Sequence, residues 1–184
     1  YLIRHVQYAE SQEPEELFFR TILFKIFNKI ETWEAIVRYL GDVPRSDTPL
    51  TALGIALSDA AGHGEAIYSA AYIMPNPAFH ADSKRTNHLL LLEHMMRDGA
   101  PRRVTDTKSM AALYRLMRSY PSLGDFLAFQ FTIDLNYSTI VDVPERGFVV
   151  AGPGAVNGIK KCFNGVGGLS DADVIRAVAD MAES

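Results

Sequence analysis

The sequence predicts an all-α protein, and three observations lead to this fold class. Apolar residues recur at helical spacing along most of the chain, glycines and prolines stand where helices would begin and end, and only short stretches resemble strands. With 184 residues, 48% of them apolar and 22% charged, the chain can enclose one sizeable core. We therefore expect residues 1–184 to form a single helical domain. Because the chain starts at Tyr1 rather than Met, we expect it to be a piece of a longer protein.

The first half of the chain is divided by recognisable helix boundaries. Pro14 suits the first turn of a long helix, because its missing N–H would have no partner there. Gly41 has the freedom expected of the residue that follows a helix end. From these signals and the apolar pattern we expect a short helix or strand at 1–8, helices at 14–30, 33–40 and 50–61, and either a helix or a strand at 66–73.

The second half shows two possible capping boxes, in which a serine and an acid three residues later bind each other's backbone N–H groups. Ser122 with Asp125 has this spacing, and so has Ser170 with Asp173. Both pairs stand before an apolar run and so predict helix starts. We expect helices at 83–97, 108–119, 122–138 and 171–181, another after Gly154, and a loop or small hairpin at 139–150.

The helix expected at 122–138 is apolar almost all round, which predicts that it is the buried central helix of the bundle. Within it, Gln130, Asp134 and Tyr137 are spaced to share one face. A buried carboxylate is costly unless it is paired or used. Asp134 is therefore either a structural acid satisfied by a cap, a tyrosine or an arginine, or a general base. The other members of this candidate catalytic set are Gln130, Asn136 and Tyr137.

A Gly-Pro-Gly turn at 152–154 leads into the next helix, with Lys160 and Lys161 one to two turns further on. Backbone N–H groups at a helix start can bind an anion, and lysines add charge. The turn lacks the G-x-x-x-x-G-K-[ST] pattern of a nucleotide-binding loop and the strand context of a dinucleotide site. It resembles the hairpin of a helix–hairpin–helix element, whose glycine amides hold a DNA phosphate. The alternative is a plain turn between packed helices. The candidate phosphate ligands are Gly152, Gly154, Lys160 and Lys161.

Arg20 and Asn28 interrupt an otherwise apolar helix and lie two turns apart, so they share a face. Either they reach a phosphate and join the candidate DNA-binding set, or they pair with Asp134 and a helix end. The sequence favours neither alternative over the other.

Composition and motif spacing exclude several classes of protein. The net charge of −4 gives no overall attraction to nucleic acid, so phosphate binding requires a local basic patch. The single cysteine, Cys162, excludes an internal disulfide and suits an intracellular protein. The five histidines show no metal-ligand spacing. We therefore expect no metal and no cofactor, and because no apolar run is long enough to cross a bilayer, no membrane partner.

Four segments together resemble a known family, the helical domain named for 5-hydroxymethyluracil DNA kinase, which is grouped with the α-glutamyl/putrescinyl thymine pyrophosphorylases. The segments are FFRTILFKIFNKIETWE (18–34), HLLLLEHMMRDG (88–99), YPSLGDFLAFQFTIDLNYS (120–138) and FVVAGPGAVNGIKKCF (148–163). The resemblance covers residues 1–163. It implies an all-α bundle similar to the helix–hairpin–helix DNA glycosylases and work on a modified thymine in DNA, with an activated base or an amine as a possible co-substrate.

Three functions follow from the resemblance and the residues together. The first is an enzyme that transfers a group to a 5-hydroxymethyluracil-derived base flipped out of DNA. The second is a helix–hairpin–helix module that binds nucleic acid without catalysis. The third is a DNA N-glycosylase, which requires an aspartate after the hairpin; Asp171 and Asp173 are the candidates. Because the chain carries no nucleotide-binding loop, we interpret the word kinase in the family name as an inherited label and leave the transferred group open.

Overall fold

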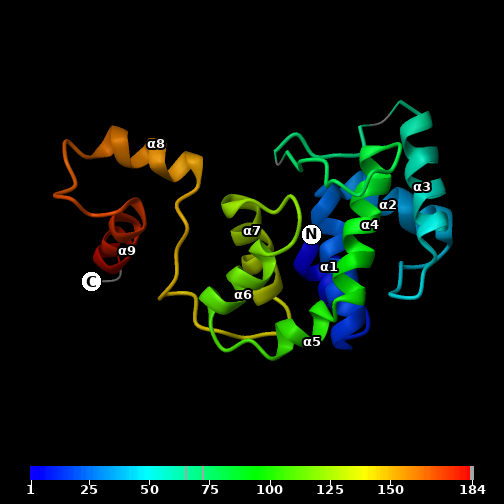
Figure 1. The fold of residues 1–184 in the computed structure, drawn as a ribbon, viewed down its shortest axis with the longest axis horizontal. Coiled ribbons are helices and arrows are strands. Elements are labelled where there is room, and N and C mark those ends of the chain that lie inside the picture. The colour runs from blue at the N-terminus through cyan, green and yellow to red at the C-terminus, as the bar shows by residue number, and fades with distance from the viewer. Residues whose placement is uncertain (65, 72, 183–184) are drawn as a thin grey trace.

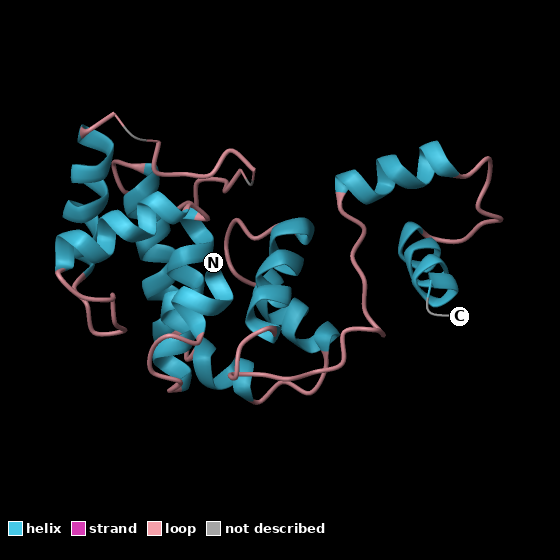
Figure 2. Cartoon of the chain, turned by 180° about the vertical axis from the view of Figure 1, so that it is seen from behind, coloured by secondary structure: helices cyan, strands magenta, loops and turns pink. Residues whose placement is uncertain are grey.

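The computed structural model describes residues 1–64, 66–71 and 73–182. This part of the chain contains helices and no strand, which confirms the all-α prediction for it (Figure 1, Figure 2). None of its helices is both long and apolar enough to cross a bilayer. The elements are η1 (Leu2–Gln7), α1 (Pro14–Phe27), α2 (Ile30–Leu40), α3 (Leu50–Gly62), α4 (Lys84–Arg97), α5 (Ala100–Thr105), α6 (Met110–Arg118), α7 (Asp125–Asn136), α8 (Pro153–Cys162) and α9 (Asp171–Ala182).

Helix α1 is the centre of the core. Every residue from Leu17 to Phe27 is buried, because η1, α4, α5 and α7 all pack against this helix. The prediction that the helix near 122–138 would be central is therefore wrong. Helix α7 buries one face, which includes Leu127, Phe131 and Leu135. Its other apolar side chains, among them Phe126, are only partly buried against the core.

The remaining helices pack in pairs around this centre. Helices α2 and α3 pack on each other and α3 also contacts α4, while α6 packs along α7. Helices α8 and α9 form a pair of their own, which both views show to one side of the other helices, beyond a long connection (Figure 1, Figure 2). The main body is thus built around α1, and the α8–α9 pair is joined to it by residues 137–152.

Several helix boundaries agree with the sequence signals. Pro14 lies in the first turn of α1, and Gly41 follows α2 with φ 76°. Ser83 accepts a hydrogen bond from the backbone N–H of Thr86 at the start of α4. The capping box before α9 is also confirmed, since the backbone N–H of Asp173 donates to Ser170 Oγ at 3.2 Å and the backbone N–H of Ser170 donates to the Asp173 carboxylate at 3.3 Å.

Other boundaries differ from the predictions. The capping box at Ser122 is wrong: Ser122 has φ 65°, α7 begins after Gly124, and the Asp125 side chain instead accepts bonds from Tyr114 and Arg118. Helix α5 was not predicted, because its six residues are too short to show periodicity. In the stretch 66–73 the described residues form neither helix nor strand, and residue 72 lies outside the described part.

The connection between α7 and α8 bears on the predicted hairpin. Residues 137–152 contain turns and extended backbone but no helix, so no helix stands directly before Gly152. The Gly152–Gly154 segment is itself the start of α8, with Gly152 as the N-cap and Pro153 in the first turn. It therefore lacks the tight turn between two helices that a helix–hairpin–helix element has, and the relationship to the glycosylase fold stays a prediction.

Candidate functional site

The carboxylate of Asp134 meets an ammonium group where α7 crosses α1. Asp134 Oδ2 lies 2.6 Å from Lys25 Nζ, and the two side chains are 18% and 6% exposed. Burial raises the pKa of Asp134, and the positive charge of Lys25 opposes that rise. The Asp134 side chain keeps some exposure, but the Oδ2 atom that faces Lys25 is itself enclosed, so solvent screens the attraction between the two charges only weakly.

Gln7 supports this pair from the end of η1. Its side chain is fully buried, and its Nε2 donates to the backbone carbonyl of Asp134 at 2.8 Å and to Thr21 Oγ1 at 3.3 Å. Its Oε1 has no hydrogen-bond partner among the described residues. Neither Gln7 nor Lys25 was predicted for the site. In the sequence, Lys25 interrupts the apolar run of a core helix. A charged residue at such a position was the signal that could have identified it, because lysine is seldom buried without a partner.

The other candidates on α7 separate into two groups. Gln130 is partly buried, one turn before Asp134 on the same side of the helix. Asn136 instead fixes the chain that follows: its Nδ2 donates to the Val143 carbonyl at 3.0 Å, and its Oδ1 accepts from the Val143 N–H at 3.0 Å. Tyr137 is an exposed ring just past the helix end. Gln130 and Asp134 thus lie on the same side of α7, whereas Asn136 binds the loop that follows the helix.

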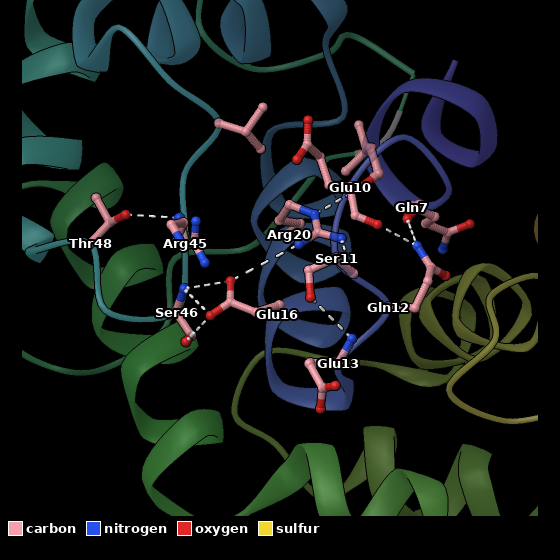
Figure 3. Close-up of polar contacts among 12 residues, drawn as sticks. Gln7, Glu10, Ser11, Gln12, Glu13, Glu16, Arg20, Arg45, Ser46 and Thr48 are labelled. Atoms are coloured by element: carbon pink, nitrogen blue, oxygen red, sulfur yellow. Dashed lines mark hydrogen bonds and ion pairs between the residues drawn. The ribbon is translucent and has the colours of Figure 1, made fainter.

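Arg20 is buried inside the protein, and Figure 3 shows the polar groups of η1 and α1 that surround its side chain. Its side chain is 2% exposed, and its Nε and Nη2 donate to the carbonyls of Val6 and Ser11 at 3.0 and 2.6 Å. Glu16 Oε2 lies 4.0 Å from Nη1, and burial lowers the pKa of the guanidinium. The enclosed guanidinium thus links η1 and the turn that follows it to α1. We therefore do not include Arg20 among the proposed DNA contacts. It does not pair with Asp134, which takes Lys25 instead.

Asn28 closes α1 in the left-handed conformation, with φ 48°, and its backbone N–H donates to the Phe24 carbonyl at 2.6 Å. Asparagine tolerates this conformation better than most residues. Of the two alternatives for this position, the structure therefore supports the one that places it at a helix end.

The candidate phosphate ligands are spread along α8. A Cβ on Gly152 would lie 2.9 Å from the Phe126 ring, so close packing accounts for this glycine, whereas a Cβ on Gly154 would meet open space. Lys160 and Lys161 lie in the last turn, and at 1.5 Å per residue they are about 10 Å along the axis from Gly154. The two groups cannot hold the same phosphate, although both remain exposed.

The aspartates considered for a glycosylase lie at the start of α9. The carboxylate of Asp173 accepts from Ser170 and Arg176, and these partners lower its pKa. It is therefore used as a helix cap. Within the described residues there is no group of three or more His, Cys, Asp or Glu side chains placed to hold a metal ion.

Comparison with known proteins gives one match. No curated protein and no solved structure matches the chain significantly. A family described as "5-hmdU DNA kinase, helical domain" matches residues 1–184. Because the match covers the whole chain, including the α1 and α7 segments that form the Lys25–Asp134 pair, the protein belongs to the family of 5-hydroxymethyl-deoxyuridine DNA kinase helical domains.

Proposed function

We propose that this domain holds a 5-hydroxymethyluracil nucleotide of DNA and that Asp134 acts on its hydroxymethyl group. The family description links the chain to this modified base in DNA and to a kinase. The observation that carries the residue assignment is the Asp134–Lys25 pair, 2.6 Å apart and only partly open to solvent on an otherwise largely apolar helix.

The chemistry of the pair suits a hydroxyl substrate. For the hydroxymethyl oxygen to attack a phosphoryl group it must lose a proton, and a positioned carboxylate can accept that proton as the O–P bond to the base forms and the bond to the leaving group breaks. The neighbouring Lys25 would keep the carboxylate ionised and would stabilise negative charge on the oxygen. Gln130, on the same side of α7, would contact the polar edge of the base.

We infer that the phosphoryl donor binds outside this helical domain. The chain carries no G-x-x-x-x-G-K-[ST] loop, and the family is described as a helical domain of a kinase. A nucleoside triphosphate would accordingly bind elsewhere, while this domain supplies the acceptor base and the proton acceptor. The base would have to leave the duplex to reach Asp134.

Nucleoside mass spectrometry tests the proposal. DNA that contains 5-hydroxymethyluracil, and matched DNA that contains thymine, would be incubated with a nucleoside triphosphate and a protein that includes both this domain and the part that binds the triphosphate, and then digested. We expect a phosphorylated nucleoside from the first DNA alone, and its loss in Asp134→Asn. If the hydroxymethyl DNA binds in preference to the thymine DNA but no product forms, the second candidate, a recognition module without catalysis, is favoured. The observation that supports this second candidate is that the Asp134 carboxylate is already paired with Lys25.

A further inference from the structure

The N-terminal helix η1 carries side chains that the proposed site does not use. It is a π-helix, in which the Tyr8 N–H donates to the Ile3 carbonyl five residues back at 3.0 Å. Such helices are rare and occur often at functional sites. Its inner side holds Val6 and Gln7, which are fully buried, and its outer side presents Ile3 and Arg4. Arg4 precedes Tyr8 by four residues, about one turn of this helix, and we name the exposed group of Ile3, Arg4, Tyr8 and Tyr137 the η1–α7 face.

Hydrogen bonds join this face to the Asp134 region. Gln7 Nε2 donates to the Asp134 carbonyl at 2.8 Å, and the next residue, Tyr8, donates through its hydroxyl to the Tyr137 carbonyl at 3.1 Å. Neighbouring residues on η1 therefore hold neighbouring positions at the end of α7. As a result, the Tyr8 side chain is held against the backbone of Tyr137, and Tyr137 follows Asp134 by three residues, within one turn along the chain.

The η1–α7 face has the chemistry of a surface that binds unpaired nucleotides. Tyr8 and Tyr137 are 51% and 47% exposed, and Ile3 is 43% exposed. Arg4 is also exposed and makes no ion pair in the described part of the chain. Exposed aromatic rings beside a free guanidinium are typical of single-strand binding, in which bases stack on rings while cations contact phosphates. The bond from the Tyr8 hydroxyl to the Tyr137 carbonyl holds the Tyr8 ring in place, which reduces the entropy lost when a base stacks on that ring.

The geometry points to the η1–α7 face as the platform for the DNA strand that flanks the target nucleotide. Unpaired bases stack on Tyr8 and on Tyr137 and Arg4 contacts the backbone phosphate, so that the next nucleotide is directed to Asp134. This inference rests on the proposed function for its ligand, DNA. It adds a surface that neither the family description nor the α8 glycine turn supplies.

Fluorescence anisotropy with labelled oligonucleotides tests the platform. Two DNAs are used, a single strand of thymine nucleotides and the same strand with one 5-hydroxymethyluracil. Removing a stacking ring costs about 1–3 kcal/mol per base, so Tyr8→Ala and Tyr137→Ala should each weaken binding of both strands about 5- to 150-fold. Tyr8→Phe keeps the ring but loses its bond to the Tyr137 carbonyl, so it should weaken binding less than Tyr8→Ala does. Arg4→Gln should reduce the slope of log affinity against log salt by about 0.7.

Matched controls come from helix α2, on which Tyr39 is 46% exposed and Arg38 lies beside it. Tyr39→Ala and Arg38→Gln should leave both affinities and the salt slope unchanged. Circular dichroism melts of every variant identify any loss of binding that is due to unfolding. The double variant Tyr8→Phe/Tyr137→Phe provides a folded reference that keeps both rings.

Each outcome distinguishes the platform from the proposed function. If the alanine variants bind as the unchanged protein does while the preference for 5-hydroxymethyluracil persists, the platform is wrong and the proposed function stands. If they weaken binding but the unchanged protein shows no such preference, the platform stands and the assignment of Asp134 fails. If the control variants on α2 weaken binding equally, or if the protein binds neither strand, the platform is overturned.

Discussion

Replacing one member of the Lys25–Asp134 pair should destabilise the protein, and the loss should depend on which member is replaced. The ammonium is 6% exposed and the carboxylate 18%, so the cation is the costlier group to leave without its partner. Breaking a buried ion pair costs about 3–5 kcal/mol. We expect Asp134→Leu to lower the free energy of unfolding by about 4 kcal/mol and Lys25→Met by about 2 kcal/mol, because the more exposed carboxylate regains water or a proton.

The double variant Lys25→Met/Asp134→Leu should recover most of this loss, because apolar side chains of similar size replace both charges. Urea denaturation at pH 7 measures all four proteins and gives the coupling energy of the pair. The reasoning is refuted if the single losses simply add in the double variant, or if Asp134→Leu costs less than Lys25→Met.

The pH dependence provides a check on the same pair. Burial raises the pKa of Asp134 in the folded protein, and Lys25 holds that rise back. An acid with a raised pKa stabilises the fold below its unfolded pKa, and this contribution is lost as pH rises through the folded pKa. Lys25→Met removes the opposing charge, so its deficit relative to the unchanged protein should be small in acid and should grow towards neutral pH. An equal deficit at every pH would contradict this assignment.

The remaining predictions concern the fold outside the pair. His88 is fully buried between Tyr68 Oη and the Pro75 carbonyl, both at 2.8 Å, and burial lowers its pKa to about 4. Since the unfolded chain takes up this proton near pH 6.5, about 3 kcal/mol of stability should be lost as pH falls from 6.5 towards 4, and His88→Gln should flatten that curve in urea titrations. Gly152→Ala should destabilise by about 1–3 kcal/mol through its contact with the Phe126 ring. Gly154→Ala, which meets open space, should be neutral or stabilising by up to about 1 kcal/mol in thermal melts; an equal loss in both variants would contradict the packing reason. Ser170→Ala should cost about 1 kcal/mol and speed amide exchange in the first turn of α9, where unchanged exchange would refute its role as a cap.

The sequence was sufficient to predict the fold class and most helices, because periodicity, prolines and capping residues act locally. It could not identify the central helix. α1 and α7 are both rich in apolar residues, and only the packing of η1, α4, α5 and α7 on α1 decides which of the two is enclosed. The predicted capping box of Ser122 and Asp125 was wrong for a related reason. The two residues have the right spacing, yet the Asp125 carboxylate is bound by side chains of α6.

The candidate site was predictable in part. Asp134 stood out as an acid on an apolar helix, and the alternatives considered for its partner included arginine. The actual partner, Lys25, lies more than a hundred residues away in sequence, and only the crossing of α1 and α7 brings the two together. The roles of Asn136 and Gly152 in holding a loop and admitting the Phe126 ring depend on tertiary contacts that no local pattern contains.

The most direct test of the central claim compares the affinity for DNA that contains 5-hydroxymethyluracil with that for otherwise identical thymine DNA. The two differ by one hydroxyl, and a hydrogen bond from it to a carboxylate contributes about 1.5–3 kcal/mol. The unchanged protein should prefer the hydroxymethyl DNA by about 10- to 150-fold, and the folded double variant Lys25→Met/Asp134→Leu should show no preference. A preference retained in the double variant, or one absent from the unchanged protein, would contradict the assignment of Asp134 to the substrate.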